Sequence, residues 1–217
     1  MRNGIKRIFV CFLAVLLCIC LGFTGLDVSA ASAGFIARNS KTAMTRLDKG
    51  AENLTPHKTF KVYNIQGKET TSYKYTMSKN DLAILKGFAK EHFTEKMDAA
   101  DKVAYTMEWI HKNVKYASVS SDWNKIAGKS FVDAIFTCRT GQCAQYNGTL
   151  VSMMAYLGYD VSLVQGYRAS KYSSWQHFWG QVKIDGVTYL LEAGNAGKSG
   201  NWYYLCAKYS ETKGYVR

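Results

Sequence analysis

Three residues supply the side chains of a nucleophile, a base and an acid: Cys143, His177 and Glu192. Cys143 follows the turn-forming stretch Thr140–Gln142 and opens an apolar-periodic run, 143–157, whose spacing predicts a helix. The sulfur would then lie at a helix N-terminus, where unpaired N–H groups and the helix dipole favour thiolate over thiol. Because the thiolate is the reactive form of cysteine, Cys143 is the candidate nucleophile.

A predicted β-hairpin brings the base and the acid together. Two extended runs, 177–184 and 187–193, are separated by an Asp-Gly pair, which suits a type I′ turn. Counting back from this turn places Trp179 opposite Glu192, so His177 lies one diagonal step from Glu192 on the same face. Diagonal neighbours are roughly 7 to 8 Å apart at the backbone, within reach of long side chains. We therefore expect Glu192 to hold one imidazole nitrogen while the other faces the cysteine.

Each of the three residues also has an ordinary structural interpretation. A cysteine in an apolar run is usually part of the core, and a histidine or glutamate on a strand is more often structural than catalytic. The conjunction of a helix-start cysteine with a histidine and a carboxylate on one face of a hairpin favours a triad.

Several short motifs, taken in order from about Met97 to Ala193, resemble the transglutaminase-like superfamily of papain-related thiol enzymes. Each motif is weak alone, but their shared order is more specific. The resemblance implies an α+β, papain-like fold in which the nucleophile helix packs on an antiparallel sheet, and it implies no cofactor. The motifs are Asn113–Tyr116, Ser130–Phe136, Gly141–Cys143, Leu157–Tyr159, His177–Trp179 and Asp185–Glu192.

Two positions depart from the family pattern. The family usually has aspartate, often followed by Pro-Thr, where this chain has Glu192 followed by Ala193-Gly194. Glutamate keeps the charge but adds a methylene. Its hydrogen bond to the base therefore requires a shifted strand or a different side-chain rotamer. The larger animal enzymes have tryptophan where Ala144 stands, and the match is to the compact bacterial branch.

The resemblance implies a role for each candidate residue. Cys143 would attack a carboxamide or peptide carbonyl, His177 would accept and return the proton, and Glu192 would orient the imidazole. The backbone N–H of Cys143 and the side chain of Gln142 would stabilise the oxyanion. Trp179, two residues after the base and on its face, is expected to border the cleft.

The acceptor of the resulting thioacyl group stays open. Transfer to water would make a protease or deamidase, whereas transfer to an amine would make a cross-linking enzyme; we favour hydrolysis. A cell-wall peptidase with a similar cysteine and histidine is an alternative, although Gly141-Gln142 favours the transglutaminase-like group. An inert descendant that binds the cell surface is another, although the intact triad argues against it.

The N-terminus predicts export. Residues 1–30 combine basic residues at positions 2, 6 and 7 with an apolar stretch, 8–23, and a small-residue cleavage site ends at Ala30 or at Ala33. We expect a cleaved signal peptide and a secreted or surface-bound protein. Residues 31–58 are expected to form a flexible leader or a first helix, and residues 59–217 a single catalytic domain.

The composition is strongly basic. Removal of residues 1–30 takes away three basic residues and Asp27, so the net charge falls from +12 to +10. The lysines are scattered, which disfavours a nucleic-acid partner; besides a protein or peptide substrate, an anionic cell-wall polymer or membrane surface would fit. A merely well-solvated basic surface is an equal alternative.

Three cysteines lie beyond the signal: Cys138, Cys143 and Cys206. An odd number suits one free nucleophile plus a Cys138–Cys206 disulfide, and two unpaired thiols are the alternative. The spacing lacks the paired short intervals of structural zinc sites, so no metal is expected.

The rest of the sequence predicts ordinary structural elements. Residues 59–77 alternate like a β-hairpin, and 161–166 like a strand. Residues 78–93 and 98–113 have the apolar spacing of amphipathic helices.

Overall fold

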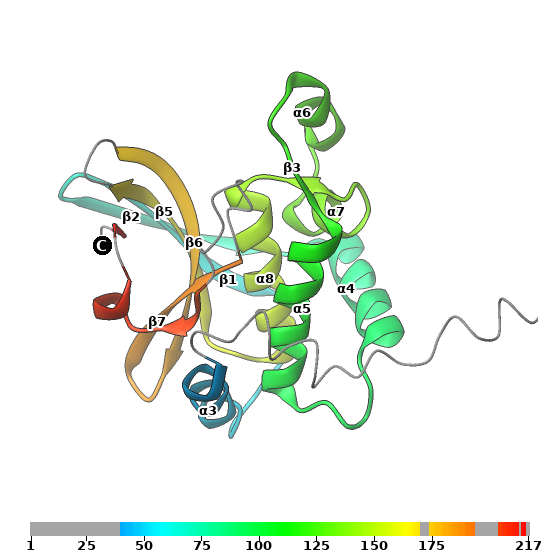
Figure 1. The fold of residues 1–217 in the computed structure, drawn as a ribbon, viewed down its shortest axis with the longest axis vertical. Helices are drawn as coiled ribbons and strands as arrows, with labels where there is room; N and C mark the ends of the chain where they lie inside the picture. The colour runs from blue at the N-terminus through cyan, green and yellow to red at the C-terminus, as the bar shows by residue number, and fades with distance from the viewer. Residues whose placement is uncertain (1–39, 170–173, 194–203, 213, 216–217) are drawn as a thin grey trace, which may run out of the picture.

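A single six-stranded sheet runs through the molecule, with the strand order β2-β1-β5-β6-β7-β8 (Figure 1). The computed structural model describes residues 40–169, 174–193, 204–212 and 214–215. Neighbouring strands are antiparallel except for the parallel pair β1 and β5. The strands are β1 (Thr59–Gln66), β2 (Glu69–Thr76), β5 (Val161–Ala169), β6 (Ser174–Ile184), β7 (Val187–Glu192) and β8 (Tyr204–Ala207).

Helices gather on one side of this sheet, and the C-terminal 3₁₀ turn Tyr209–Glu211 lies on the other (Figure 1). A separate two-stranded ribbon pairs β3 (Lys115–Tyr116) with β4 (Thr140–Gly141). This arrangement confirms the predicted α+β class. The helices are α3 (Ser40–Gly50), α4 (Lys79–His92), α5 (Ala99–Asn113), α6 (Ser120–Ile126), α7 (Phe131–Phe136) and α8 (Cys143–Leu157).

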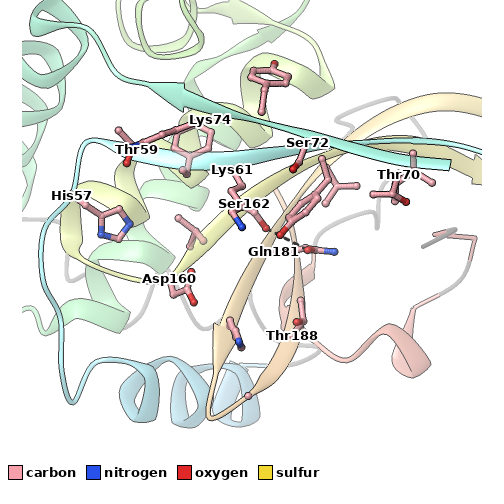
Figure 2. A pocket seen from close by; sticks show the side chains of 18 residues that line it. His57, Thr59, Lys61, Thr70, Ser72, Lys74, Asp160, Ser162, Gln181 and Thr188 are labelled. Atoms are coloured by element: carbon pink, nitrogen blue, oxygen red, sulfur yellow. Dashed lines mark hydrogen bonds between the residues drawn. The ribbon is translucent and has the colours of Figure 1, made fainter.

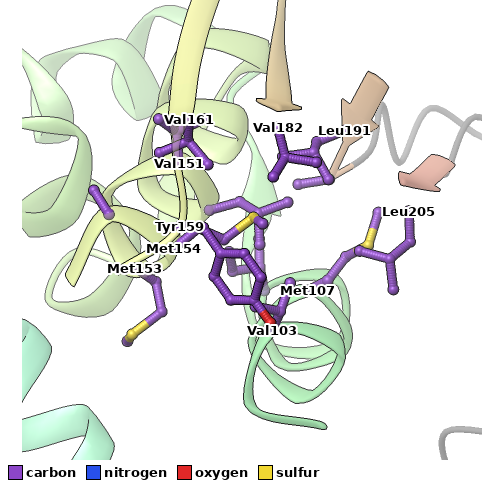
Figure 3. Close-up of a cluster of buried hydrophobic side chains, with 14 of the residues drawn as sticks. Val103, Met107, Val151, Met153, Met154, Tyr159, Val161, Val182, Leu191 and Leu205 are labelled. Carbon is purple, nitrogen blue, oxygen red and sulfur yellow. The ribbon is translucent and has the colours of Figure 1, made fainter. Parts of the chain in front are cut away.

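The main core lies between α8, α5 and the sheet (Figure 3). Val151 and Met154 of α8 meet Met107 of α5 on one side and Val182 and Leu191 of the strands on the other, all of them buried. Burial of such side chains is the dominant favourable term in folding. The core therefore fixes α8, whose first residue is Cys143, against the strands β6 and β7.

Polar caps fix where the flanking helices begin. The Ser78 hydroxyl accepts from the N–H of Asp81, and the Asp81 carboxylate accepts from the N–H of Ser78, which forms a capping box at α4. The Ser130 hydroxyl accepts from the N–H of Asp133 at the start of α7 and donates to the Asp81 carboxylate. These contacts tie α4 to α7, and α4 begins where the sequence predicts.

Helix α3 agrees with the first helix that the sequence offered, beside a flexible leader, for residues 31–58. Ala43 and Leu47, four residues apart, are buried in the core, and the Tyr159 hydroxyl donates to the Leu47 carbonyl over 3.2 Å. Arg46 forms an ion pair with Glu211 at 3.0 Å. Two apolar positions among polar residues give only a weak periodic signal for a helix. Tertiary packing of these two residues supplies the remaining stabilisation of α3. Residues 31–39 lie outside the described residues.

The predicted export signal, residues 1–30, also lies outside the described residues. None of the helices in the described ranges has the length and hydropathy that crossing a membrane requires.

The three remaining cysteines are free thiols. Cys138 is half-buried beside Ala117 and Ile126, whereas Cys206 is buried in the main core. The alternative of a Cys138–Cys206 disulfide is therefore wrong, and the alternative of unpaired thiols holds. Within the described part of the chain, no cluster of three or more His, Cys, Asp or Glu side chains is suited to hold a metal ion.

Candidate active site

Helix α8 begins at Cys143, as the sequence predicts. Gln142 is the N-cap residue with an extended backbone, and its N–H donates to the Gln145 side chain over 3.0 Å. Gly141 pairs with Tyr116 in the β3–β4 ribbon. A Cβ added to Gly141 would come within 2.8 Å of the Gln145 Cβ, so a close approach requires glycine there. These contacts fix the chain at the point where it presents the half-buried thiol.

The β6–β7 hairpin has the predicted turn and register. Asp185 and Gly186 have φ values of 49° and 78°, and positive φ at both central residues is the mark of a type I′ turn. Gln181 pairs with Leu190, as counting back from the turn predicts. The hairpin therefore carries residues 177 and 192 to the positions expected from the sequence.

His177 and Glu192 form a buried pair. The imidazole Nε2 lies 2.6 Å from the Glu192 Oε2, with side-chain exposures of 2% and 0%. The imidazole also hydrogen-bonds Cys143. Because Nε2 is engaged with Glu192, Nδ1 is the ring nitrogen left for the thiol. The structure thus brings together the three residues of the predicted triad.

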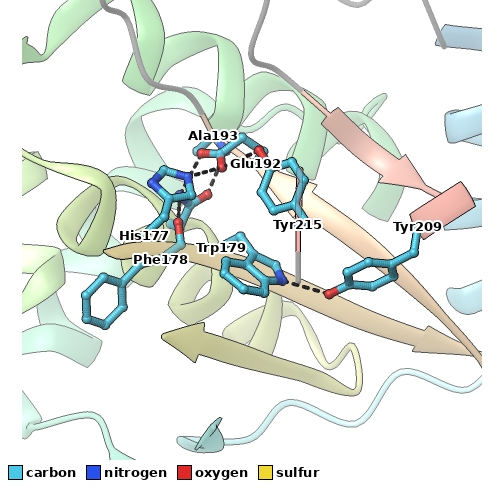
Figure 4. A network of polar contacts seen from close by, with 8 residues as sticks. His177, Phe178, Trp179, Glu192, Ala193, Tyr209 and Tyr215 are labelled. Atoms are coloured by element: carbon cyan, nitrogen blue, oxygen red, sulfur yellow. Dashed lines mark hydrogen bonds and ion pairs between the residues drawn. The ribbon is translucent and has the colours of Figure 1, made fainter. Parts of the chain in front are cut away.

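Two further donors complete the surroundings of the Glu192 carboxylate (Figure 4). Oε1 accepts from Asn147 Nδ2 at 2.8 Å, and Oε2 accepts from the Tyr215 hydroxyl at 2.9 Å. A carboxylate without solvent contact is costly unless hydrogen bonds satisfy its oxygens. The contacts with His177, Asn147 and Tyr215 satisfy the carboxylate oxygens in the interior, and the extra methylene relative to aspartate is accommodated.

Asn147 also joins the helix to both strands of the hairpin. Besides Glu192, its Nδ2 donates to the Phe178 carbonyl at 2.8 Å, and its Oδ1 accepts from the Ala193 N–H at 2.7 Å. Neither Asn147 nor Tyr215 is among the residues that the sequence predicts for the site. A polar residue one helical turn after Cys143 in an apolar helix was a usable signal for Asn147, whereas Tyr215 has no local signal.

Burial alone would lower the pKa of His177, but the Glu192 charge and the hydrogen bonds to Cys143 and Glu192 outweigh it. Together they raise the pKa from its ordinary 6.5 to about 9. The imidazole is therefore protonated at neutral pH and can stabilise an adjacent thiolate.

A pH dependence of stability follows from this raised pKa. Below the unfolded value of 6.5 the contribution of His177 is fully present, and it is lost as the pH rises through about 9. We expect the free energy of unfolding, measured by urea denaturation, to fall over this interval. Glu192→Gln should flatten the fall, because the charge that raises the pKa is removed. An identical slope in both proteins would show that another group titrates.

Tyr116 contacts the nucleophile from the β3–β4 ribbon. Burial, and then the charge of Cys143, raises the pKa of the phenol to about 12, although a hydrogen bond from the Cys143 backbone N–H opposes the rise. Its ring packs on Tyr146, with centroids 6.0 Å apart. A phenol that stays protonated at neutral pH beside the thiol is a hydrogen-bond donor for negative charge there.

The two residues expected at the oxyanion or the cleft have other contacts. The Gln142 side chain donates to the Ala117 carbonyl over 2.7 Å, which anchors the β3–α6 connection to the helix start. Trp179 is fully buried and does not border an open cleft. Its indole donates to the Tyr209 hydroxyl at 2.7 Å, and its ring stacks on His177 with centroids 6.4 Å apart. The alternation of the strand predicted the face on which Trp179 lies. It did not predict that the C-terminal segment covers this face.

The fold and the geometry agree with a comparison of the chain with known families. The model of the transglutaminase-like superfamily matches residues 86–204, which is more than half of the chain. The chain belongs to the transglutaminase-like superfamily. The superfamily match thus includes the helix start with Cys143 and the hairpin with His177 and Glu192.

Two solved structures are similar to parts of this chain. A candidate cysteine protease from Cytophaga hutchinsonii is 22% identical over 52% of this chain and 37% of that chain, with a TM-score of 0.40. A structure described as a TGase is 15% identical over 61% of this chain and 36% of that chain, with a TM-score of 0.42. The chain thus spans less than two fifths of either protein. No curated protein matches it.

Proposed function

We propose that the protein is a cysteine-dependent enzyme that attacks peptide or glutamine-type amide carbonyls through a thioacyl intermediate. The observation that carries this proposal is the buried 2.6 Å contact between His177 and Glu192, with the imidazole beside Cys143 at the start of α8. Nucleophile, base and orienting acid then have the mutual geometry of a thiol triad.

The reaction divides into two steps. In the first, the Cys143 thiolate attacks the carbonyl carbon, and negative charge develops on the carbonyl oxygen. The Tyr116 phenol beside the thiol would donate to that charge, whereas the Cys143 N–H, which donates to the Tyr116 oxygen in this structure, would have to release that oxygen to do the same. The His177 imidazolium gives its proton to the leaving nitrogen, the C–N bond breaks, and a thioester and an amine result.

In the second step the neutral imidazole takes a proton from water, which attacks the thioester and releases a carboxylic acid and the thiolate. Glu192 holds the ring in place through both steps, because its carboxylate is itself held by Asn147 and Tyr215. The residues that touch reacting atoms are therefore Cys143, His177 and Tyr116, whereas Glu192 acts as a positioning residue.

We favour water over an amine as the acceptor. Water at ~55 M competes for any exposed thioester, and only a dry or acceptor-shaped site gives an amine precedence. With residues 1–30 acting as a signal peptide, the substrates would be proteins or peptides outside the cytoplasm. Mature protein recovered from culture should then begin near Ala31 or Gly34, and intact Met1 on such material would contradict export.

Product partitioning tests the choice of acceptor. A peptide or glutamine-type amide that acylates the enzyme is supplied together with a primary amine, and acid and amide products are quantified by mass spectrometry. We expect acid to predominate at neutral pH. Predominant amide would instead identify an acyltransferase, and absence of any thioacyl adduct on Cys143 would contradict both activities.

A further inference from the structure

An open depression of about 990 Å³ lies on the face of the sheet that points away from α8 (Figure 2). It extends over β1, β2, β5 and β6, and its lining includes three lysines: Lys61, Lys74 and Lys183. Asp160 is the one carboxylate among the described lining residues. The depression, named here the lysine groove, therefore carries an excess of positive charge.

One row of side chains crosses the floor of the lysine groove from strand to strand. Lys74 pairs with Lys61, Lys61 with Ser162, and Ser162 with Gln181. Both lysines are exposed, and among the described residues neither forms an ion pair. Like charges directly opposite each other on a strand pair repel. An anion bound between them would relieve that repulsion, so the row points to a negatively charged ligand.

The neighbouring groups offer hydrogen bonds and an aromatic surface. Thr70 and Ser72 present exposed hydroxyls along the edge strand β2. The Ser162 hydroxyl donates to the Gln181 side chain over 3.3 Å, as Figure 2 shows. The next row pairs Ser72 with the half-buried Tyr63. Hydroxyls and a tyrosine ring match the hydroxyls and the C–H face of a sugar, which a simple inorganic anion lacks.

The lysine groove is separate from the thiol site, although both lie along β6. Gln181 is four residues from His177, or about 13 Å at the rise of a strand. Between them Trp179 is fully buried, and both Trp179 and Gln181 bond the Tyr209 hydroxyl. The C-terminal segment thus closes the His177 end of this face, whereas the end with the lysines is open as far as the described residues extend.

We propose that the lysine groove binds a linear acidic polysaccharide. Lys61 and Lys74 hold an anionic group of the polymer, and Tyr63 and the hydroxyls of β2 contact the sugar. A bound polymer would retain the enzyme at a surface without occupying the thiol site. The inference does not rest on the proposed function, so Cys143→Ala protein should bind the polymer as well as the unmodified protein does.

Titration calorimetry with polygalacturonate, at several salt concentrations, tests this inference. We expect the double variant Lys61→Gln/Lys74→Gln to bind at least tenfold more weakly and with a smaller salt dependence. Its matched control is Lys86→Gln/Lys90→Gln, which removes the same charge from exposed lysines of α4 and should leave binding unchanged. Equal weakening of both variants, or no binding of polygalacturonate, would overturn the proposal.

A second comparison separates a saccharide site from a site for charge alone. Tyr63→Leu keeps an apolar side chain in place, and we expect it to weaken polygalacturonate binding while inorganic polyphosphate binding is unchanged. Neutral dextran should bind neither the unmodified protein nor the Tyr63→Leu variant. If polyphosphate binds as tightly as polygalacturonate and Tyr63→Leu weakens neither, the groove recognises charge only and the assignment to a polysaccharide is wrong. Unfolding temperatures of all variants would establish that each one folds.

Discussion

Replacement of Cys143 by alanine is expected to lower the rate of amide cleavage by on the order of 10³-fold or more. The thiol is the only group at the start of α8 that can form a covalent intermediate, and its partner His177 is already positioned by Glu192. The measurement is kcat/KM on an amide substrate, together with iodoacetamide labelling near neutral pH. Both the activity and the fast labelling should disappear.

Cys138→Ala is the matched control for this variant. Cys138 is also a half-buried free thiol, but it lies in a small apolar cluster away from His177. Its replacement should leave turnover and fast labelling intact. Cys206 is unsuitable as a control, because it is buried in the core with a φ of 53°. If Cys138 proved to be the fast-reacting thiol, the assignment of the nucleophile would be wrong.

Glu192→Gln is expected to lower kcat by about 10²- to 10⁴-fold while the fold is retained. The variant keeps the shape of the side chain but loses the charge that holds the imidazolium. Its amide also places a donor where the carboxylate accepts from His177, Asn147 and Tyr215. The pH profile of kcat/KM should shift to lower pH on its alkaline side, because the pKa of His177 is no longer raised by Glu192.

Two variants separate the charge of Glu192 from its reach. Tyr215→Phe removes one donor and keeps the charge, so its loss of rate should be much smaller than that of Glu192→Gln. For Glu192→Asp the family preference favours good tolerance. The structure favours an intermediate loss, because a shorter side chain cannot keep all three partners without movement of β7. Unchanged turnover in Glu192→Gln would transfer the orienting role to another residue.

Local sequence signals were sufficient for most elements near the site. The turn before Cys143 and the apolar period after it predicted α8 to the residue, and the Asp-Gly pair fixed the turn and register of β6 and β7. Short-range rules succeed here because a type I′ turn allows only one register between the two strands. The alternation of side chains along each strand then determines which face of the sheet each residue occupies. The diagonal neighbours His177 and Glu192 followed from that count.

Long-range contacts decided what local signals could not. Helix α3 depends on Ala43 and Leu47 meeting a core made by residues distant in the sequence. Tyr215, near the C-terminus, donates to Glu192, and Tyr209 accepts from Trp179 and so covers the face expected to border the cleft.

The sequence by itself determined the types, the order and the local geometry of Cys143, His177 and Glu192. Only the tertiary structure decided how the buried carboxylate is satisfied, since Asn147 and Tyr215 reach it from other parts of the chain. The physical reason is that hydrogen bonds within a turn or a strand pair depend on neighbouring residues. The desolvation of a buried charge depends instead on every element that packs around it.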